Sequence, residues 1–552
     1  MFSLIRSPWI RAVDVDGNPV EVGLHDVFSG EVNIAYLQGE SPAQNYAVMR
    51  ILLATFWRSH AQEAVVGAGK TFQFADWFEK TRDRLNEEGR DPAVVTYLEK
   101  YQDRFNLLDE HVPFMQVAGL HVASGETKHV TTIVPESQES YFSMKAGASR
   151  DTLTFSEAAR WLVYAQAYDY SGIKSGMAGD SRVKGGKGYP IGTGWTGMTG
   201  GTLIKGQTLL DTLILNTTVD CLNNPADRPV WERAVDGPDS RIAVGENPLP
   251  QGPADLATWQ SRRIRLVAEA DSVIAVVLGN GDRIPEAGAN VIDDPMTPYR
   301  FSTNKSKKDF DVYYPRPYDA ERTMWRSLDS LIVAETDAGF SGKDKAPKRP
   351  KNLSSIAVLR SEVDGIPEVL NLELVSVEYG PQASSVASTF QSSISMPVVL
   401  LLESAEHLRS TVRAAASATS ESAIALGRFA GQLLDAAGGT YEFQTPVTNR
   451  VLAELEPLFN AWLRSLKGIS EDDDDKIDKR VAQWQLDARE VIDEHARILL
   501  RGAGPKALAG RVEKKEGETK ARVVSAARYY QSLQWKLDEQ FPLTVKKKEV
   551  AK

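Results

Sequence analysis

Apolar residues in the last third of the chain recur at intervals of three and four, a spacing that places them on one face of a helix. The first such run starts near Met396 and contains Val398, Leu401, Leu402, Ala405, Leu408, Val412 and Ala415. A second helical run is expected at about residues 421–437. The pattern therefore predicts helices from residue 396 onward.

Two further helices in this region have recognisable starts. Thr445 and Pro446 form a cap with proline at the first helical position, ahead of Leu452, Leu455, Leu458, Phe459, Trp462, Leu463 and Leu466. The acidic run at residues 471–475 suits the start of the next helix, which carries Ile477, Val481, Trp484, Ala488, Ile492 and Leu499. With another helix at about residues 519–540, the pattern indicates a C-terminal helical bundle.

The first half of the chain alternates between helical and extended patterns. Residues 43–60 are predicted to form a helix. Thr154 and Glu157 have the spacing of a capping box, so a second helix is expected from there to Tyr168. Residues 208–217, rich in Leu, Ile and Thr, are predicted to be a strand. This mixture predicts an α+β fold, with either one or two compact domains ahead of the helical region.

A loop rich in glycine and positive charge separates that second helix from the predicted strand. Residues 172–206 contain twelve glycines. The cations of this loop stand against the single acid Asp180 and are Lys174, Arg182, Lys184, Lys187 and Lys205. Two more surface loops are expected at residues 296–308 and 343–351, both rich in lysine. Solvated charge alone would explain either of these two loops.

The length and composition of the chain predict at least two hydrophobic cores and argue against a membrane-spanning helix. At 552 residues, of which 42% are hydrophobic, the chain is long enough for at least two cores. Its longest apolar runs, near residues 273–278 and 398–402, fall far short of the roughly 20 residues that cross a bilayer. The N-terminus lacks the basic and apolar regions of a secretory signal. We therefore expect a cytoplasmic protein.

The charge balance limits how this protein can meet nucleic acid. The formal net charge is −10. A protein that coats nucleic acid by itself usually has a basic surface, which this composition does not provide. Any contact with DNA must therefore be local.

Metal and redox chemistry find no support in the sequence. The chain has a single cysteine, Cys221, which excludes an internal disulfide and is best interpreted as a small buried hydrophobic residue. Its seven histidines are scattered, and none forms a His-Glu-x-x-His pair. No metal site and no cofactor are predicted.

Residues 64–71, Ala-Val-Val-Gly-Ala-Gly-Lys-Thr, fit a relaxed phosphate-binding loop. Such a loop follows a buried strand and opens a helix, whereas this segment follows an amphipathic helix and leads into Phe-Gln-Phe. A nucleotide-dependent hydrolase that uses this segment is kept as an alternative function.

Gly192, Gly194 and Gly197 fit the spacing of a dinucleotide-binding loop. No strand is expected before them and a strand rather than a helix is expected after them, so the context does not fit that use. Glycines also let one backbone come close to another, as a loop lying in a DNA groove must. The acidic pair Asp293 and Asp294 is interpreted as loop solvation, and no catalytic triad can be singled out.

Four segments together resemble one known family. They are Leu4-Ile-x-x-x-Trp-Ile10, Glu110-His-Val-Pro-Phe-Met-Gln116, Gly197-Met-Thr-Gly-Gly-Thr202 and Gln382-Ala-Ser384. In order and spacing the chain resembles the CasA-type large subunit of the type I-E CRISPR surveillance complex, Cascade. The resemblance implies a mixed α/β domain of unusual topology at residues 1–390 and a C-terminal four-helix bundle at residues 396–545.

The same resemblance implies a function without catalysis. Members of this family recognise the PAM, a short motif in double-stranded target DNA, from the minor-groove side, help to separate the strands and recruit a helicase-nuclease. The implied partners are the other Cascade subunits, the CRISPR RNA, duplex DNA and the helicase-nuclease effector. A purely structural scaffold that does not touch DNA is kept as the second alternative.

The resemblance also assigns DNA contacts to particular residues. The first DNA-facing loop corresponds to Phe142, Ser143 and Met144, and the short glycine loop to Gly192, Thr193 and Gly194, with residues 185–188 as a competing placement beside Lys184. The lysine of the minor groove corresponds to Lys305, and the glutamine that wedges the duplex open corresponds to Gln382. Minor-groove edges differ little between base pairs, so contacts of this kind predict permissive PAM reading.

Overall fold

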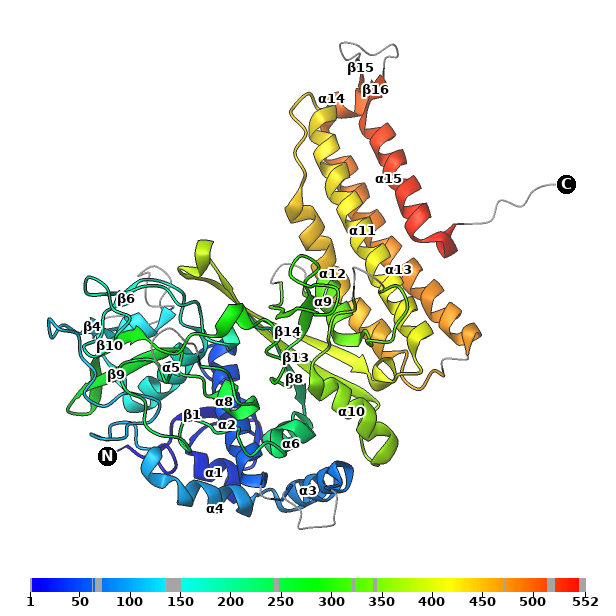
Figure 1. Cartoon of the computed structure of the whole chain (residues 1–552). Helices are drawn as coiled ribbons and strands as arrows, with labels where there is room; N and C mark the ends of the chain where they lie inside the picture. The colour runs from blue at the N-terminus through cyan, green and yellow to red at the C-terminus, as the bar shows by residue number, and fades with distance from the viewer. Residues whose placement is uncertain are drawn as a thin grey trace. The chain divides into compact units, whose positions relative to one another are not determined.

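The computed structural model describes residues 2–61, 63–64, 72–135, 150–242, 248–319, 323–340, 345–470, 473–513 and 522–545 (Figure 1). The chain divides into two compact units. Unit 1 comprises Met1–Ala320, Gly339–Ile366 and Asn371–Ser393, and unit 2 comprises Glu321–Ala338, Pro367–Leu370 and Ile394–Lys552. Helices and strands are both abundant, as the α+β prediction requires.

Unit 1 contains short and medium helices, the longest of which is Pro42–His60. They are α1 (Leu24–Ser29), α2 (Pro42–His60), α3 (Phe74–Glu88), α4 (Pro92–Lys100), α5 (Phe155–Tyr168), α6 (Leu209–Leu215), α7 (Val219–Leu222), α8 (Pro253–Ala257) and α10 (Lys351–Glu362). The helix predicted at residues 43–60 is confirmed as α2, whose start is capped: the Ser41 side chain accepts a hydrogen bond from the Gln44 backbone, and Pro42 occupies the first turn. Most of its residues are buried, and α4, α5 and α8 pack around it.

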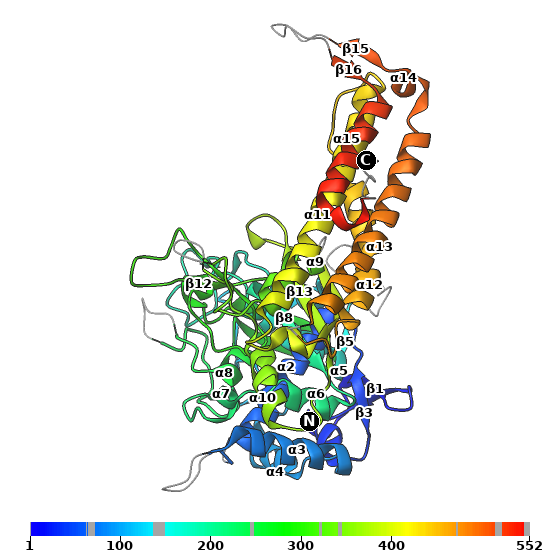
Figure 2. The same cartoon turned by 90° about the vertical axis from the view of Figure 1, so that its right-hand side faces the viewer.

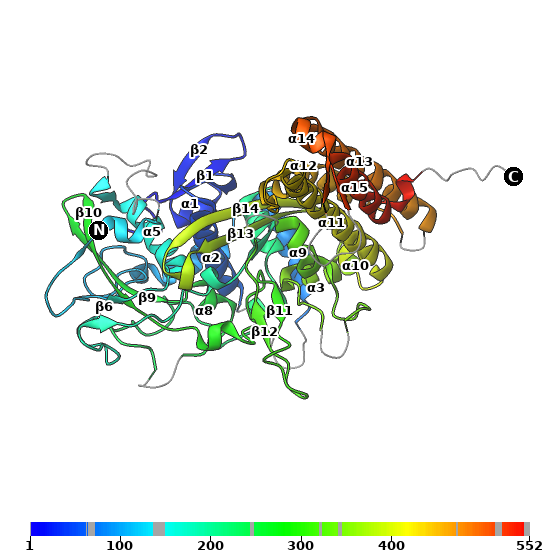
Figure 3. The same cartoon turned by 90° about the horizontal axis from the view of Figure 1, so that it is seen from above.

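The strands of unit 1 form several small antiparallel sheets (Figure 3). One sheet has the order β2 (Pro19–Val22), β1 (Ile10–Asp14), β3 (Ile34–Leu37). In another, β10 (Ser272–Asn280) pairs with β9 (Arg262–Glu269), β4 (Lys128–His129) and β5 (Leu153–Thr154). A third has the order β14 (Val386–Pro397), β13 (Val369–Tyr379), β8 (Gly201–Lys205). Two hairpins, β6 (Lys174–Ser175) with β7 (Lys187–Gly188) and β11 (Tyr299–Phe301) with β12 (Tyr313–Pro315), complete the described pairings.

The predicted strand at residues 208–217 is wrong. The segment forms helix α6, whose residues are all buried, and the Thr208 side chain caps it by accepting from the backbone of Asp211. An apolar run buried on all sides has no polar face, so its sequence cannot distinguish a short helix from a strand. The strand expected here lies just before it, as β8. The capping box of Thr154 and Glu157 at the start of α5 is confirmed.

Unit 2 is built mainly from helices that run alongside one another (Figure 2). Its elements are α9 (Thr323–Ile332), α11 (Glu406–Ala436), α12 (Thr445–Arg464), α13 (Asp474–Arg501), α14 (Gly504–Ala509), β15 (Arg511–Glu513), β16 (Arg522–Val524) and α15 (Ala526–Gln540). Trp484 of α13 is buried against Phe459 and Trp462 of α12, and its Nε1 donates to Thr419 Oγ1 of α11 at 3.1 Å. The apolar face predicted for α13 therefore forms this core.

The helix boundaries in unit 2 differ from the prediction at several points. Residues up to Pro397 belong to strand β14, and the two helices predicted between residues 396 and 437 are one helix, α11. Helix α12 is capped at Gln444, one residue before the predicted cap. Asp473 caps α13 as its acidic run indicates, and α15 starts only at Ala526 because β16 precedes it. The apolar spacing located the helices, but it did not mark where extended segments join them.

Among the residues that the structure describes, no helix combines the length and the apolar character needed to cross a membrane. Cys221 is buried, as its interpretation as a small hydrophobic residue requires.

Candidate nucleic-acid interface

Arg262 holds the base of the glycine-rich segment. Its side chain is 1% exposed, and Nη2 donates to the carbonyl oxygens of Asp169, Tyr170 and Gly192 at 3.1, 2.9 and 2.9 Å. Its Nε also donates to the Asp169 carboxylate. Because one guanidinium bonds to the end of α5 and to Gly192 together, the segment is fixed to the core where it begins and where it returns.

Lys174 belongs to this buried cluster and not to the basic surface. Its Nζ lies 2.6 Å from Asp169 Oδ2 and 4.0 Å from the centre of the Tyr170 ring. Burial lowers the pKa of Lys174 to about 8, against the attraction of Asp169. The other cations of the segment are partly neutralised as well, since Arg182 pairs with Asp180 and Lys205 with Glu373.

Lys184 and Lys187 remain as the exposed cations of the segment, and they flank a tight turn. The two residues exchange backbone hydrogen bonds of 3.1 and 3.2 Å across Gly185 and Gly186. Both glycines have positive φ, +57° and +71°, which a two-residue hairpin turn requires. A Cβ on either glycine would meet nothing within 4 Å. This turn, at the competing placement of the glycine loop, presents open backbone and positive charge together.

Gly192, Thr193 and Gly194 have a different setting. Gly192 is partly exposed, but Thr193 and Gly194 are buried. A Cβ on Gly194 would lie 2.5 Å from the carbonyl oxygen of Gln166 and 2.6 Å from that of Ala167, so glycine is needed there for packing on α5. The close backbone approach expected of this loop is therefore made to the protein itself, at least at Gly194.

Lys305 lies in the exposed loop between β11 and β12. Its backbone N–H donates to Ser302 O at 3.3 Å, and the Ser306 hydroxyl bridges the loop by donating to Ser302 O and accepting from Val312 N. The side chains of Lys305, Lys307 and Lys308 are exposed. Within the described residues these lysines form no ion pair, whereas Lys345 nearby pairs with Asp311 at 2.5 Å. The loop thus offers free positive charge on a braced backbone.

Gln382 sits at the tip of the β13–β14 hairpin. Its backbone has φ 57° and ψ 22°, a left-handed conformation that is uncommon for a residue with a side chain. Hydrogen bonds around it close the turn, from Gly380 N to Ser385 O at 3.0 Å and from Ala383 N to Gly380 O at 2.9 Å. The Gln382 side chain is exposed and bonds to no other described residue. An ordinary turn glutamine tied to its own loop does not fit this geometry.

Two predicted segments fall outside the description. Phe142, Ser143 and Met144 lie within residues 136–149, and residues 65–71 of the phosphate-loop pattern lie outside the described residues as well. The loop assigned to residues 142–144 therefore stays a prediction.

The interpretation of Asp294 as a solvated loop acid is wrong. Asp294 is fully buried, and its Oδ2 accepts from Arg50 Nη1 at 2.7 Å and from Trp195 Nε1 at 2.6 Å. Burial opposes the charge on Arg50, but the attraction of Asp294 raises the pKa of the guanidinium above its usual range. An acidic pair in a loop gave no sign of this, because the partner arginine is distant in sequence. Only Asp293 of the pair keeps partial exposure.

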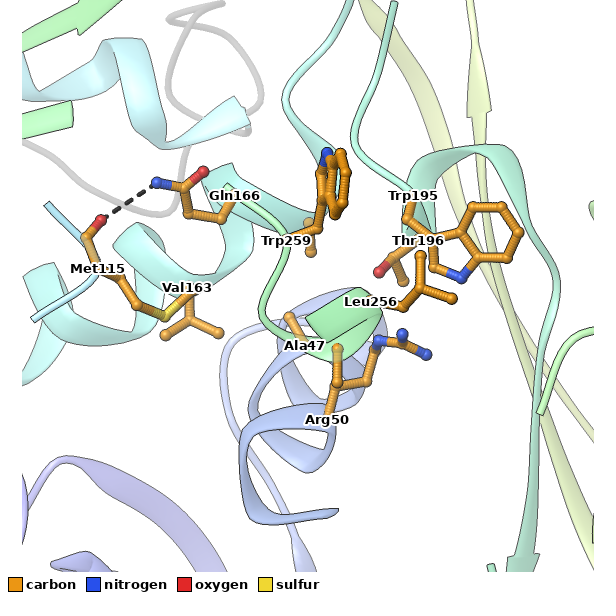
Figure 4. A pocket seen from close by; sticks show the side chains of 11 residues that line it. Ala47, Arg50, Met115, Val163, Gln166, Trp195, Thr196, Leu256 and Trp259 are labelled. Carbon is orange, nitrogen blue, oxygen red and sulfur yellow. Dashed lines mark hydrogen bonds between the residues drawn. The ribbon is translucent and has the colours of Figure 1, made fainter. Parts of the chain in front are cut away.

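A small cavity next to this ion pair is enclosed by α2, α5 and the Trp195 and Trp259 rings (Figure 4). Gln166 of α5 lines one side of it and donates to the Met115 carbonyl at 3.2 Å. The cavity has a volume of about 10 Å³, room for about one water molecule. It is part of a packed core, not a ligand site.

Comparisons with known proteins identify the family to which this fold belongs. The model of the family "CRISPR-associated protein Cse1" matches residues 3–494. The crystal structure of Cse1 from Thermobifida fusca is 32% identical, covers 99% of each chain and superposes with a TM-score of 0.82. The protein CasA/Cse1 of Thermus thermophilus is 26% identical over 341 residues, which span 60% of this chain and 60% of that relative. This chain therefore belongs to the Cse1 family.

A chain in the structure of a CRISPR RNA-guided surveillance complex shares the fold. It is 19% identical, the match covers 90% of this chain and 99% of that one, and the TM-score is 0.62. At this identity the likeness concerns architecture alone.

Proposed function

We propose that this protein is a non-catalytic subunit of an RNA-guided CRISPR surveillance complex. In this proposal it recognises the PAM in double-stranded DNA, promotes opening of the duplex and recruits the helicase-nuclease effector. Family membership and the fold shared with a surveillance-complex chain support the assignment. Its partners would be the other subunits, the CRISPR RNA and the target duplex, and sequence selection beyond the PAM would fall to base pairing by the guide.

The observation that carries the proposal is the placement of free lysines. On a chain of net charge −10, Lys184 and Lys187 flank one exposed turn, and Lys305 and its neighbours occupy another. Other cations of the glycine-rich segment, such as Lys174 and Arg182, are neutralised in ion pairs. The exposed turns are therefore where a phosphate backbone would be attracted. Lys305 would enter the minor groove, where the negative potential is strong and the base edges are degenerate.

Gln382 would act as the wedge beside the PAM. Its turn is closed by backbone hydrogen bonds, so the side chain projects from a fixed base. An amide can replace hydrogen bonds that a base pair loses when it opens, and opening one step costs a few kcal/mol. Helices α11, α12, α13 and α15 would form the four-helix bundle of the family in this proposal.

The test compares DNA binding by complexes that are reconstituted with the guide RNA and carry a parent or variant chain. Lys305→Ala and Lys184→Ala should each weaken binding to a PAM-containing duplex. Lys80→Ala is the matched control, because Lys80 is an exposed lysine of helix α3 and belongs to neither turn. Unchanged duplex binding by both turn variants would favour the scaffold alternative, and nucleotide turnover by the purified chain would favour the hydrolase alternative.

A further inference from the structure

Exposed aromatic side chains are few in the described part of unit 1. They are Tyr36, Tyr189 and Phe310, with exposed fractions of 42%, 55% and 60%. Tyr36 already has a partner, since Lys205 lies over its ring at 5.4 Å from the centroid. The other two rings belong to the turns that carry the free lysines.

Phe310 is held by its backbone while its ring stays uncovered. Its N–H donates to Lys307 O at 3.2 Å and its carbonyl accepts from Lys307 N at 2.8 Å, so both backbone groups are used within the turn. No other aromatic ring contacts it among the described residues. Lys307 and Lys308 precede the ring with exposed side chains. The direct neighbours of Phe310 in the chain are the exposed acid Asp309 and Asp311, whose charge is paired with Lys345.

Tyr189 repeats this arrangement at the other turn. Its carbonyl accepts from Asn280 Nδ2 at 2.7 Å, which ties the backbone to strand β10. Gly188 lets the chain lie against that amide, because a Cβ there would come within 2.9 Å of Asn280 Nδ2. Tyr189 is more than half exposed, two residues beyond Lys187.

A lysine beside an uncovered, anchored ring is the combination that binds single-stranded nucleic acid. Lysines attract the phosphates, and the ring stacks on a base whose face is not hidden by its neighbours in a duplex. Phenylalanine has no hydrogen-bonding group, so Phe310 cannot read a base edge and stacking is what remains for it. A protein partner is the weaker explanation, because lysine is depleted from the cores of protein interfaces.

We propose that these two turns bind unpaired bases of single-stranded DNA, Phe310 and Tyr189 by stacking and the adjacent lysines through phosphates. The inference deepens the proposed function and rests on it in one respect, because duplex opening near Lys305 would supply the unpaired bases. Phe310 follows Lys305 by five positions in the same loop, so a base released at the minor-groove contact has a ring close at hand.

The first test uses the full-length chain and a fluorescently labelled oligothymidine of about 15 nucleotides, a length within the range that such proteins cover. Phe310→Leu and Tyr189→Leu should each weaken binding about fivefold or more, the smallest loss expected when one base loses its stacking partner. The slope of affinity against salt should not change, since no charge is removed. Tyr441→Leu in unit 2 is the control, because Tyr441 is 48% exposed but outside the two lysine turns.

Photo-crosslinking gives a second readout that does not depend on affinity. Oligonucleotides that contain iodouracil should crosslink to the peptides with Phe310 and Tyr189, identified by mass spectrometry. Parent-like oligothymidine binding by both leucine variants, or crosslinks confined to other peptides, would overturn the inference. Duplex binding measured with Lys305→Ala in parallel keeps the outcomes apart, because the proposed function fails only if that variant also binds a PAM duplex like the parent. Loss of complex assembly with normal oligothymidine binding would assign the rings to a protein partner instead and would equally overturn the inference.

Discussion

His60 Nε2 lies 2.8 Å from Asp91 Oδ2 inside unit 1, and both side chains are fully buried. The other ring nitrogen, Nδ1, lies 2.9 Å from Glu63 Oε1. Burial alone lowers the pKa of His60, but the hydrogen bonds to Asp91 and Glu63 raise it to about 9. His60 is therefore a cation at neutral pH that joins the end of α2 to the first residue before α4.

This ion pair predicts a loss of stability in mild alkali. The pKa of His60 is higher in the folded chain than in the unfolded one, so its contribution is complete below about pH 6.5 and is lost as the pH rises through about 9. The free energy of unfolding should fall by a few kcal/mol over this interval. Urea unfolding at several pH values measures the effect, and His60→Gln should flatten the profile. A parent profile as flat as that of the variant would contradict the assignment of charge to His60.

Asp294 and Asp293 form a matched pair for testing the buried Arg50 contact. Asp294→Asn removes the charge that compensates Arg50, and breaking a buried ion pair in this way destabilises a protein by about 3–5 kcal/mol. Asp293→Asn, one residue away but partly exposed, should change stability by less than about 0.5 kcal/mol. Chemical denaturation followed by tryptophan fluorescence gives both values. Equal effects of the two substitutions would show that the Arg50 contact contributes little.

The sequence predicted the fold best where local signals decide structure. The helix at residues 43–60, the capping box at Thr154 and the apolar face of α13 each follow from residues close together in the chain. The helix α6 and the ion pair of Asp294 did not follow, because both depend on burial by distant segments. Local apolar patterns predict which residues are buried, but they do not predict which distant segments pack against them.

Two alanine substitutions distinguish a glycine that is needed for packing, Gly194, from one in an open turn, Gly185. Gly194→Ala should destabilise the chain by about 3 kcal/mol, because the new Cβ would meet two backbone carbonyls of α5. Gly185→Ala has open space around it but a positive φ, so the loss should be about 1 kcal/mol. Thermal unfolding of both variants measures the difference. If Gly194→Ala is tolerated as well as Gly185→Ala, the packing of residues 192–194 on α5 is not what fixes that loop.

Gln382→Ala should slow the opening of a paired target without affecting assembly. A target that is already mismatched beside the PAM should be spared, because its opening has been completed in advance. R-loop formation on paired and mismatched duplexes measures this difference. Gln391→Ala on strand β14 is the control, since it removes another exposed glutamine of the same hairpin. Parent-like rates for Gln382→Ala on the fully paired target would remove this residue from the mechanism.

The free chain should bind duplex DNA weakly and with a steep dependence on salt, because the lysines proposed to meet DNA lie in a few turns of a protein whose net charge is −10. Lys305→Ala should reduce the salt slope by about 1, the value expected for one lost phosphate contact. Lys80→Ala should leave it unchanged. Fluorescence anisotropy at a series of salt concentrations gives the slopes, and tight binding that salt does not weaken would contradict this picture.

Only part of the candidate site could be predicted from the sequence, because exposure and ion pairing depend on segments that are distant in the chain. Lys305 and Gln382 could be named from the sequence because resemblance to the family assigned them; both are exposed, and their contact with DNA stays a prediction. The free lysines of the glycine-rich segment could not be told from the neutralised ones, since Lys174 pairs with Asp169 only once the segment folds back. Phe310 and Tyr189 carried no signal at all, because an exposed ring and a buried ring look alike in a sequence.

The guanidinium of Arg262 has a consequence for how such a protein can change over time. By bonding to the carbonyls of both Tyr170 and Gly192, it ties the two ends of the glycine-rich segment to one buried side chain. Residues at the outer turn can be replaced, added or removed there while the clamp keeps the interior in register. The outer turn, with Lys184 and Lys187 at its ends, is thus the part of this segment where an engineer could most easily graft new residues.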